Sequence, residues 1–337
     1  MSADAIPVSI LTGFLGSGKT TMLGHLLRQA EFSRTAVIIN EFGEIGLDHE
    51  LLEESEDSVI ELTTGCLCCK VRTDLTQTLQ DLLQRRDEGI APFDRIVIET
   101  SGLADPAPIL QTLMTDIALS ARLALAGVVT TVDGVTGADT LGREWVSQKQ
   151  VAVADRLVLT KLDLPEATEA RLRRRLAALN NCAPVLRADH GRIDPRILLR
   201  ADHAEKQITS PEAYAEKQLH APHGAVKTYA VMREEPIRAV TLTLFLETLA
   251  EHCGPDLLRL KGIVNLVESP DRPAVIHGVQ HVFHAPTWLD CWPSADRRSR
   301  IVFIVRHIPQ GWVEVLLDAI GAEVADVTES VDPLSFS

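Results

Sequence analysis

The stretch GFLGSGKT, residues 13–20, decides the fold of the first half of this 337-residue sequence. It fits the pattern G-x-x-x-x-G-K-[ST] of a phosphate-binding loop at every fixed position. The apolar run VSIL precedes it, and a run with apolar residues at helical spacing follows it. A glycine-rich turn between a strand and a helix directs backbone N–H groups toward a bound phosphate. The segment therefore predicts a nucleotide site at the edge of an α/β domain.

Residue type assigns a task to each position of this loop. Glycines allow the tight turn, Lys19 puts a cation on the β- and γ-phosphates, and the Thr20 hydroxyl is placed to bind Mg²⁺. The predicted nucleotide contacts in the loop are Gly13, Gly16, Ser17, Gly18, Lys19, Thr20 and Thr21.

Short apolar runs alternate with longer polar or helical segments around the loop. The runs TAVIIN, SVIEL, RIVIE, LAGVVTTVD and RLVLTK suit strands that are buried on both faces of a mostly parallel sheet. We expect a P-loop domain over residues 1–200, a polar linker over 201–225 and a smaller α+β domain over 226–322, followed by a tail over 323–337. In the second domain, AVTLTLFLETLAEHCGPDLLRLKGIVNL is expected to form a strand, a helix and a strand.

Composition narrows the classes of partner. The formal net charge of −14 argues against nucleic acid, because binding phosphates along a strand needs many Lys and Arg side chains. No apolar stretch approaches the roughly 20 residues that span a bilayer, and the N-terminus does not resemble a signal peptide. We therefore expect a cytoplasmic protein with no membrane partner, whose thiols stay reduced.

Two further motifs follow apolar runs. In RIVIETSGLADP, Glu99 ends a strand where a carboxylate can hold Mg²⁺ directly or through water, and the Gly102 N–H can reach the γ-phosphate; an exposed strand-end glutamate is the alternative. In LVLTKLDL, the residues Thr160, Lys161 and Asp163 resemble the base-recognition element of GTPases. A carboxylate can accept from both N1–H and the 2-amino group of guanine, which adenine lacks. A plain strand-end turn is the alternative here.

The segment TTGCLCCKVR, residues 63–72, holds three of the six cysteines. Thiolates of Cys66, Cys68 and Cys69 suit Zn²⁺ and similar ions. Two thiolates with a carboxylate and a water or a partner's ligand are more plausible than three, because two of the cysteines are adjacent. A redox switch through C-x-x-C and inert packing are the alternatives. The lone residues Cys182 and Cys291, like Cys253, are expected to be buried small hydrophobes.

Taken together, GFLGSGKTT, NEFGEIGLD, GCLCC, ETSGLADP and TKLD resemble the motifs of the CobW-type P-loop GTPases, which traffic metals. LLRLKGIVNL and VIHGVQHVFH look like the C-terminal domain of that family. The resemblance implies GTP hydrolysis to GDP with Mg²⁺, coupled to binding or delivery of a transition metal, with Zn²⁺ expected first and Co²⁺ second. It also implies a metal-requiring client protein and leaves room for a homodimer.

The resemblance further assigns residues by motif. Asp48 falls in the switch segment near the attacking water, so Lys19, Asp48 and Glu99 form the implied catalytic set. Glu44 joins the three clustered cysteines as an implied metal ligand. A redox-regulated GTPase and a GTP-dependent adaptor without metal cargo remain the competing interpretations. The histidines His277, His281 and His284 suggest an auxiliary metal site, hydrogen-bonded sheet histidines or a partner surface.

Overall fold

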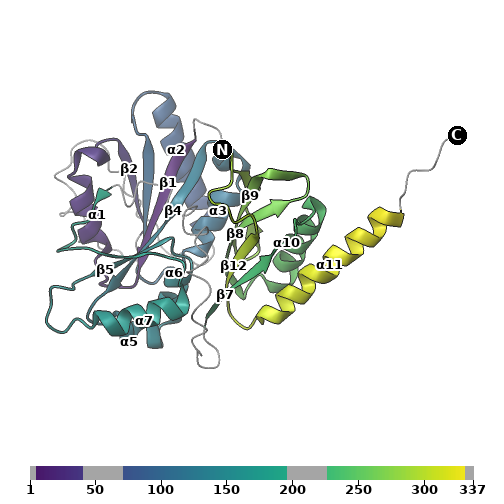
Figure 1. The fold of residues 1–337 in the computed structure, drawn as a ribbon. Coiled ribbons are helices and arrows are strands. Elements are labelled where there is room, and N and C mark those ends of the chain that lie inside the picture. Colours follow the sequence, from purple (N-terminus) through teal and green to yellow (C-terminus); the bar gives the residue numbers. More distant parts are fainter. Residues whose placement is uncertain (1–4, 41–70, 196–225, 331–337) are drawn as a thin grey trace. The chain divides into compact units, whose positions relative to one another are not determined.

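The computed structural model describes residues 5–40, 71–195 and 226–330, and the chain divides into two compact units, Met1–Ala204 and Glu205–Ser337 (Figure 1). Each unit has its own sheet. Within the described residues, no helix is long and apolar enough to cross a membrane.

The first unit is built on a six-stranded sheet in the order β2-β3-β1-β4-β5-β6, with every pair of neighbours parallel. Helices cover both of its faces (Figure 1), so the α/β prediction is confirmed. Its strands are β1 (Ile6–Gly13), β2 (Thr35–Asn40), β3 (Arg95–Thr100), β4 (Leu123–Asp133), β5 (Arg156–Thr160) and β6 (Val185–Arg187). Its helices are α1 (Lys19–Leu27), η1 (Ala30–Phe32), α2 (Val71–Asp87), α3 (Ala107–Thr115), α4 (Ile117–Ser120), α5 (Gly137–Arg143), α6 (Trp145–Ala152) and α7 (Glu169–Leu179).

The strands of this sheet read as continuous apolar runs because both of their faces are covered. On one face, Leu11 of β1 and its neighbours in β2 to β5 pack against α1, whose Met22 and Leu26 are fully buried. Side chains on the opposite face, such as Ile10 and Ile98, are also fully buried. This packing fixes α1, and with it the loop at its N-terminus, against the sheet.

The second unit holds an antiparallel sheet in the order β10-β9-β8-β12-β7, with β11 paired to β9. Its core lies between one sheet face and the two helices, where Phe303 stacks on Tyr229 at 5.5 Å between ring centroids and meets Phe245 edge-on at 6.4 Å. The elements are β7 (Lys227–Arg233), α10 (Ala239–Cys253), β8 (Leu257–Leu266), β9 (Ser269–Val279), β10 (Val282–Phe283), β11 (Thr287–Trp288), β12 (Ser299–Val305) and α11 (Gln310–Ser330).

The second unit departs from the sequence predictions in one element. The segment AVTLTL, expected as a strand, forms the first turns of α10. Its β-branched residues favour a strand, but Leu242, Phe245, Leu249 and Cys253 recur at helical spacing and are all buried in the core. Burial of this stripe therefore outweighs local propensity. Helix α11 also runs through the boundary expected between residues 322 and 323 and ends at Ser330.

Candidate nucleotide site

Four parallel strands bring their carboxyl ends to one edge of the first sheet. The register pairs Gly13 of β1 with Thr131 of β4, and Asp133 of β4 with Thr160 of β5, while Glu99 of β3 lies beside Leu11 of β1. In open parallel sheets, ligands bind outside this edge, near the central strands. The phosphate loop leaves β1 at this place, so the fold and the motif point to the same site.

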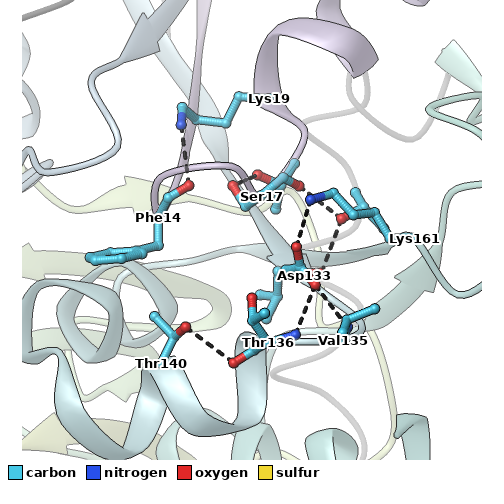
Figure 2. Close-up of polar contacts among 11 residues, drawn as sticks. Phe14, Ser17, Lys19, Asp133, Val135, Thr136, Thr140 and Lys161 are labelled. Atoms are coloured by element: carbon cyan, nitrogen blue, oxygen red, sulfur yellow. Dashed lines mark hydrogen bonds and ion pairs between the residues drawn. The ribbon is translucent and has the colours of Figure 1, made fainter. Parts of the chain in front are cut away.

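The loop has the backbone that its glycines predict. Gly18 has φ +89° immediately before α1, a left-handed conformation that disfavours other residues. At Gly13, a β-carbon would lie 2.4 Å from the Thr131 Oγ1, so a larger residue has no room. Lys19 begins α1, is buried, and places its Nζ 3.4 Å from the Phe14 carbonyl across the loop (Figure 2). Its ammonium group thus lies against the backbone of the loop.

Two threonines from neighbouring strands fix the far side of this loop. The Ser17 and Thr131 hydroxyls lie 2.7 Å apart, and the Thr160 hydroxyl donates to the Ser17 carbonyl at 2.8 Å. All three residues are buried. Thr160 thus connects the TKLD segment to the phosphate loop, a contact that the sequence did not predict; its predicted part in recognising the base stays a prediction.

Thr20 and Glu99 meet on the other side of the loop. The Thr20 hydroxyl donates to Glu99 Oε1 at 2.8 Å, and the Glu99 carboxylate is fully buried. A hydroxyl and a carboxylate are hard oxygen donors of the kind that Mg²⁺ prefers beside nucleotide phosphates. This pair fits the predicted magnesium site, whereas an exposed strand-end glutamate does not describe Glu99.

The segment after β3 lies directly against the phosphate loop. A β-carbon built on Gly102 would lie 2.7 Å from the backbone nitrogen of Leu15. From the other side, Gln150 of α6 donates its amide Nε2 to the carbonyls of Gly102 and Ala104, both at 3.1 Å. The predicted γ-phosphate contact of Gly102 therefore belongs to a segment that the surrounding structure holds close to Lys19 and its loop.

Asp133 and Lys161 form an ion pair at the ends of β4 and β5. Lys161 Nζ lies 2.7 Å from Asp133 Oδ2, and Oδ1 accepts from the backbone N–H groups of Val135 and Thr136 at 2.7 and 2.9 Å (Figure 2). Burial is the largest influence on this carboxyl and opposes its ionisation, but these hydrogen bonds together hold the pKa of Asp133 below its usual value. Lys161 adopts φ +54° and keeps its side chain at this edge.

Asp163 faces a turn that follows β6. Its Oδ2 lies 3.6 Å from Nδ1 of His190, and its side chain is about one-third exposed, at 32%. The turn closes through reciprocal backbone hydrogen bonds between Asp189 and Arg192. A β-carbon on Gly191 would lie 2.8 Å from the His25 ring of α1, so the turn packs on the same helix that begins at the phosphate loop. The exposed Thr21 lies beside it.

The predicted transition-metal ligands Glu44, Cys66, Cys68 and Cys69 lie outside the described residues, as does Asp48. Within residues 5–40, 71–195 and 226–330, no group of three His, Cys, Asp or Glu side chains could hold a metal ion. Two of the three lone cysteines are not buried as predicted, because Cys291 is exposed and Cys182 is half-buried; Cys253 is buried.

The three histidines of the second unit lie along one hairpin and its turn. His277 belongs to β9, whereas His281 follows a turn at Gln280, which has φ +55°. The chain reverses between them, so the two residues do not share one face of a strand. The backbone N–H of His284 donates to the His277 carbonyl at 2.9 Å, which makes this pair part of the β9–β10 hairpin. Only His277 lies within a strand, so the interpretation as sheet histidines fits that residue alone.

Sequence reasoning missed several residues of the site. Asp133 had a signal, since it ends an apolar run and precedes glycine in TTVDG, as Glu99 ends RIVIE. Thr131 and Gln150 had none, because their roles depend on strand register and on helix packing between residues far apart in the chain. His190 lies in the turn ADHGR after a short strand, where glycine and aspartate indicate only a turn.

Family models match both units. Residues 7–187 match the model described as "CobW/HypB/UreG, nucleotide-binding domain", and residues 226–320 match "Cobalamin synthesis protein cobW C-terminal domain". The second match begins just before β7 and ends within α11, so it covers the antiparallel sheet, α10 and the first part of α11.

Two known proteins, one of them also as a solved structure, are similar to most of the chain. The zinc chaperone YjiA of Escherichia coli is 36% identical over 91% of this chain and 96% of its own length. The zinc chaperone CobW of Pseudomonas aeruginosa is 32% identical over 90% of this chain and 88% of its own length. The crystal structure of Zn(II)-bound YjiA GTPase from E. coli covers 94% of this chain and 99% of that one, with a TM-score of 0.72 and 28% identity.

A relative from a eukaryote matches a shorter part. The zinc-regulated GTPase metalloprotein activator 1 of Schizosaccharomyces pombe is 36% identical over 57% of this chain and 47% of its own length. The names of the bacterial relatives and of this yeast relative thus all refer to zinc.

Proposed function

Because this chain belongs to the CobW/HypB/UreG family of nucleotide-binding proteins, with a CobW C-terminal domain, we propose that it is a GTP-hydrolysing zinc metallochaperone. It binds the metal at its CxCC segment and couples metal binding or delivery to the GTP cycle. The observation that best supports GTP binding is the hydrogen bond from Thr160 to Ser17, which connects the TKLD segment to the phosphate loop. Relatives that are zinc chaperones over nearly their whole length support the metal half.

The nucleotide site explains a preference for guanine. Asp163 offers a one-third exposed carboxylate a few residues beyond the Thr160 that holds the phosphate loop. A carboxylate there accepts from N1–H and the 2-amino group of guanine, and adenine has neither donor. A site built to bond a substrate N–H rejects an analogue without it, by about 10⁴–10⁵-fold where the site is closed. We expect that preference for GTP over ATP.

The phosphate end supplies the chemistry of hydrolysis. Lys19 and the loop amides stabilise negative charge on the transferring phosphoryl group, which is the main catalytic contribution in P-loop enzymes. Thr20 and Glu99 would hold Mg²⁺, which when bound neutralises phosphate charge. Asp48 is proposed to orient the attacking water. Lys19→Ala should therefore abolish turnover while leaving the fold intact.

The metal half of the proposal uses Cys66, Cys68 and Cys69 with Glu44. Zn²⁺ is the proposed cargo, with Co²⁺ as the second choice, and a metal-requiring client protein in the cytoplasm is the proposed recipient. An incomplete ligand set suits cargo, since a closed four-cysteine site holds its ion too firmly to pass on. Glu44 belongs to the segment after β2, a neighbour of β3, so nucleotide contacts at the sheet edge can reshape the metal site. A homodimer would let a second copy complete that site.

Calorimetric titration of Zn²⁺ into the reduced protein, with GDP and with a non-hydrolysable GTP analogue, tests the proposal. We expect positive coupling of about 1–3 kcal/mol, the usual range for communicating sites, and linkage then requires each ligand to tighten the other by the same factor. A Cys68→Ala/Cys69→Ala variant should lose the coupling and keep its nucleotide affinity in metal-free buffer. Equal zinc affinity in both nucleotide states would refute coupling. A turnover rate that changes with thiol oxidation and does not change with zinc would favour a redox-regulated GTPase. Tight GTP binding without turnover would favour a GTP-dependent adaptor.

A further inference from the structure

Helix α6 reaches the nucleotide site through two consecutive side chains. Gln150 is fully buried and donates to the carbonyls of Gly102 and Ala104, both at 3.1 Å. Lys149 Nζ lies 2.5 Å from Asp105 Oδ2. Both contacts end on one short segment, residues 101–106, which links β3 to α3. The helix therefore holds this segment at three successive points.

The orientation of the Gln150 amide follows from its partners. Both neighbours of Nε2 are carbonyl oxygens, which only the NH₂ end of an amide can contact favourably. Its Oε1 is buried and accepts no hydrogen bond from the described residues. Burying an amide oxygen without a donor costs free energy. An apolar side chain of the same size could fill this space without burying an amide. The amide of Gln150 is therefore explained by its two hydrogen bonds to the carbonyls of Gly102 and Ala104.

The helix that carries Gln150 is itself firmly attached. The Thr130 hydroxyl of β4 donates to the Gln150 carbonyl at 2.7 Å. Asn180 donates its side-chain amide to the carbonyls of Val151, Ala152 and Ala154, at 2.9 to 3.3 Å, where α6 ends. The end of α6 near Gln150 is therefore fixed to the sheet and to the end of α7. Its contacts can hold the segment after β3 in one place.

The held segment touches the phosphate loop at Gly102, where a β-carbon would lie 2.7 Å from the Leu15 nitrogen. Its other end is fixed by Asp105, whose Oδ1 accepts from the Ala107 N–H at the start of α3. The one backbone N–H proposed to reach the γ-phosphate thus lies between the phosphate loop and the Gln150 amide. A diphosphate has no group at that position.

We infer that Gln150 is a positioning residue for the γ-phosphate: it preorganises the Gly102 N–H, and thereby lets the protein discriminate GTP from GDP. This inference rests on the proposed nucleotide function and adds a residue of α6 to it. Lys149 assists through Asp105 at the far end of the same segment. Without the Gln150 amide, residues 101–106 become ordered only when the nucleotide binds. The free-energy cost of this ordering weakens the binding of GTP and not of GDP, because only GTP has a γ-phosphate.

The test compares Gln150→Met with Asn180→Ala by calorimetry, using GDP and a non-hydrolysable GTP analogue with Mg²⁺. Methionine keeps the length and volume and removes the amide. Losing one or two positioning hydrogen bonds should weaken analogue binding about tenfold, the equivalent of roughly 1.4 kcal/mol, with GDP binding within about twofold. Asn180 is a buried amide that holds the end of α6 but does not touch the segment after β3, so its variant should lower thermal stability and change the ratio of the two affinities less than Gln150→Met does.

Lys149→Gln provides a second variant that does not disturb a fully buried position. It should shift the affinity ratio in the same direction as Gln150→Met, by about threefold, because its ion pair is partly exposed. Equal weakening of both nucleotides in Gln150→Met, or tighter binding of the analogue, would overturn the inference. Failure of the unmodified protein to bind either nucleotide would instead overturn the proposed function, so the two failures are distinguishable.

Discussion

Replacing Thr160 by valine tests the connection between the TKLD segment and the phosphate loop. The change removes the hydroxyl that donates to the Ser17 carbonyl at 2.8 Å and puts a methyl group in its place. A buried carbonyl that loses its donor costs about 1–3 kcal/mol. A methyl carbon also needs about 3.3 Å from an oxygen, so the loop must move by roughly half an ångström. Together these effects predict a loss of about 2 kcal/mol.

For a unit of about 200 residues, this loss lowers the melting temperature by about 6 °C, which differential scanning calorimetry resolves. Displacement of the phosphate loop should weaken GDP and a GTP analogue equally, by about tenfold, and leave the ratio of GTP to ATP affinity unchanged. Thr160→Ser keeps the hydroxyl and should behave nearly as the native protein. A valine variant that keeps its stability and loses only the guanine preference would show that Thr160 serves the base and that our structural reasoning is wrong.

Three other predictions concern stability. Asp133→Ala should cost about 1–3 kcal/mol in urea unfolding, because two backbone N–H groups and a lysine lose their acceptor; Asp133→Asn should cost less, since it keeps one acceptor oxygen. Asp296 has a pKa of about 2, below its usual value, mainly through its hydrogen bonds with Arg298. Its stabilising effect is therefore complete above pH 4 and is lost as pH falls toward 2, and the native protein should lose about 1 kcal/mol more over that range than Asp296→Asn. Phe303→Ala, at the centre of the second core, should cost about 3–5 kcal/mol, against about 0.5 kcal/mol for the half-exposed Trp288→Ala; similar losses for both would contradict the packing described.

The parts of the site that the sequence could predict are those set by local pattern. Lys19 and Thr20 follow from their place between a strand and a helix, and Glu99 follows from the strand end. The contact of Thr160 with Ser17 joins residues 143 positions apart, so it depends on which strands are neighbours and in what register. Gln150 depends on how α6 is seated. No periodicity or motif in one sequence carries that information.

The fold shows the same division between local and distant causes. The first sheet was predictable because buried parallel strands are continuous apolar runs separated by helices. The start of α10 was not predictable, because Val240, Thr241 and Thr243 have a local preference for a strand. The segment forms a helix because this conformation buries Leu242 and Phe245 in the core of the second unit. The prediction that Cys182 and Cys291 are buried was wrong for a related reason. Cysteine is buried on average, but the burial of one cysteine depends on its place in the fold.

The central place of β1 in its sheet has a consequence for synthesis. This strand is made before both of its neighbours, β3 and β4, which pair it with residues near 96 and near 127. During translation, the apolar segment from Ile6 to Leu11 must therefore wait for more than a hundred further residues before both its edges are paired. Such distant pairings fold slowly, because the intervening chain must be closed first. An emerging chain of this protein thus carries an exposed, aggregation-prone strand until β4 leaves the ribosome.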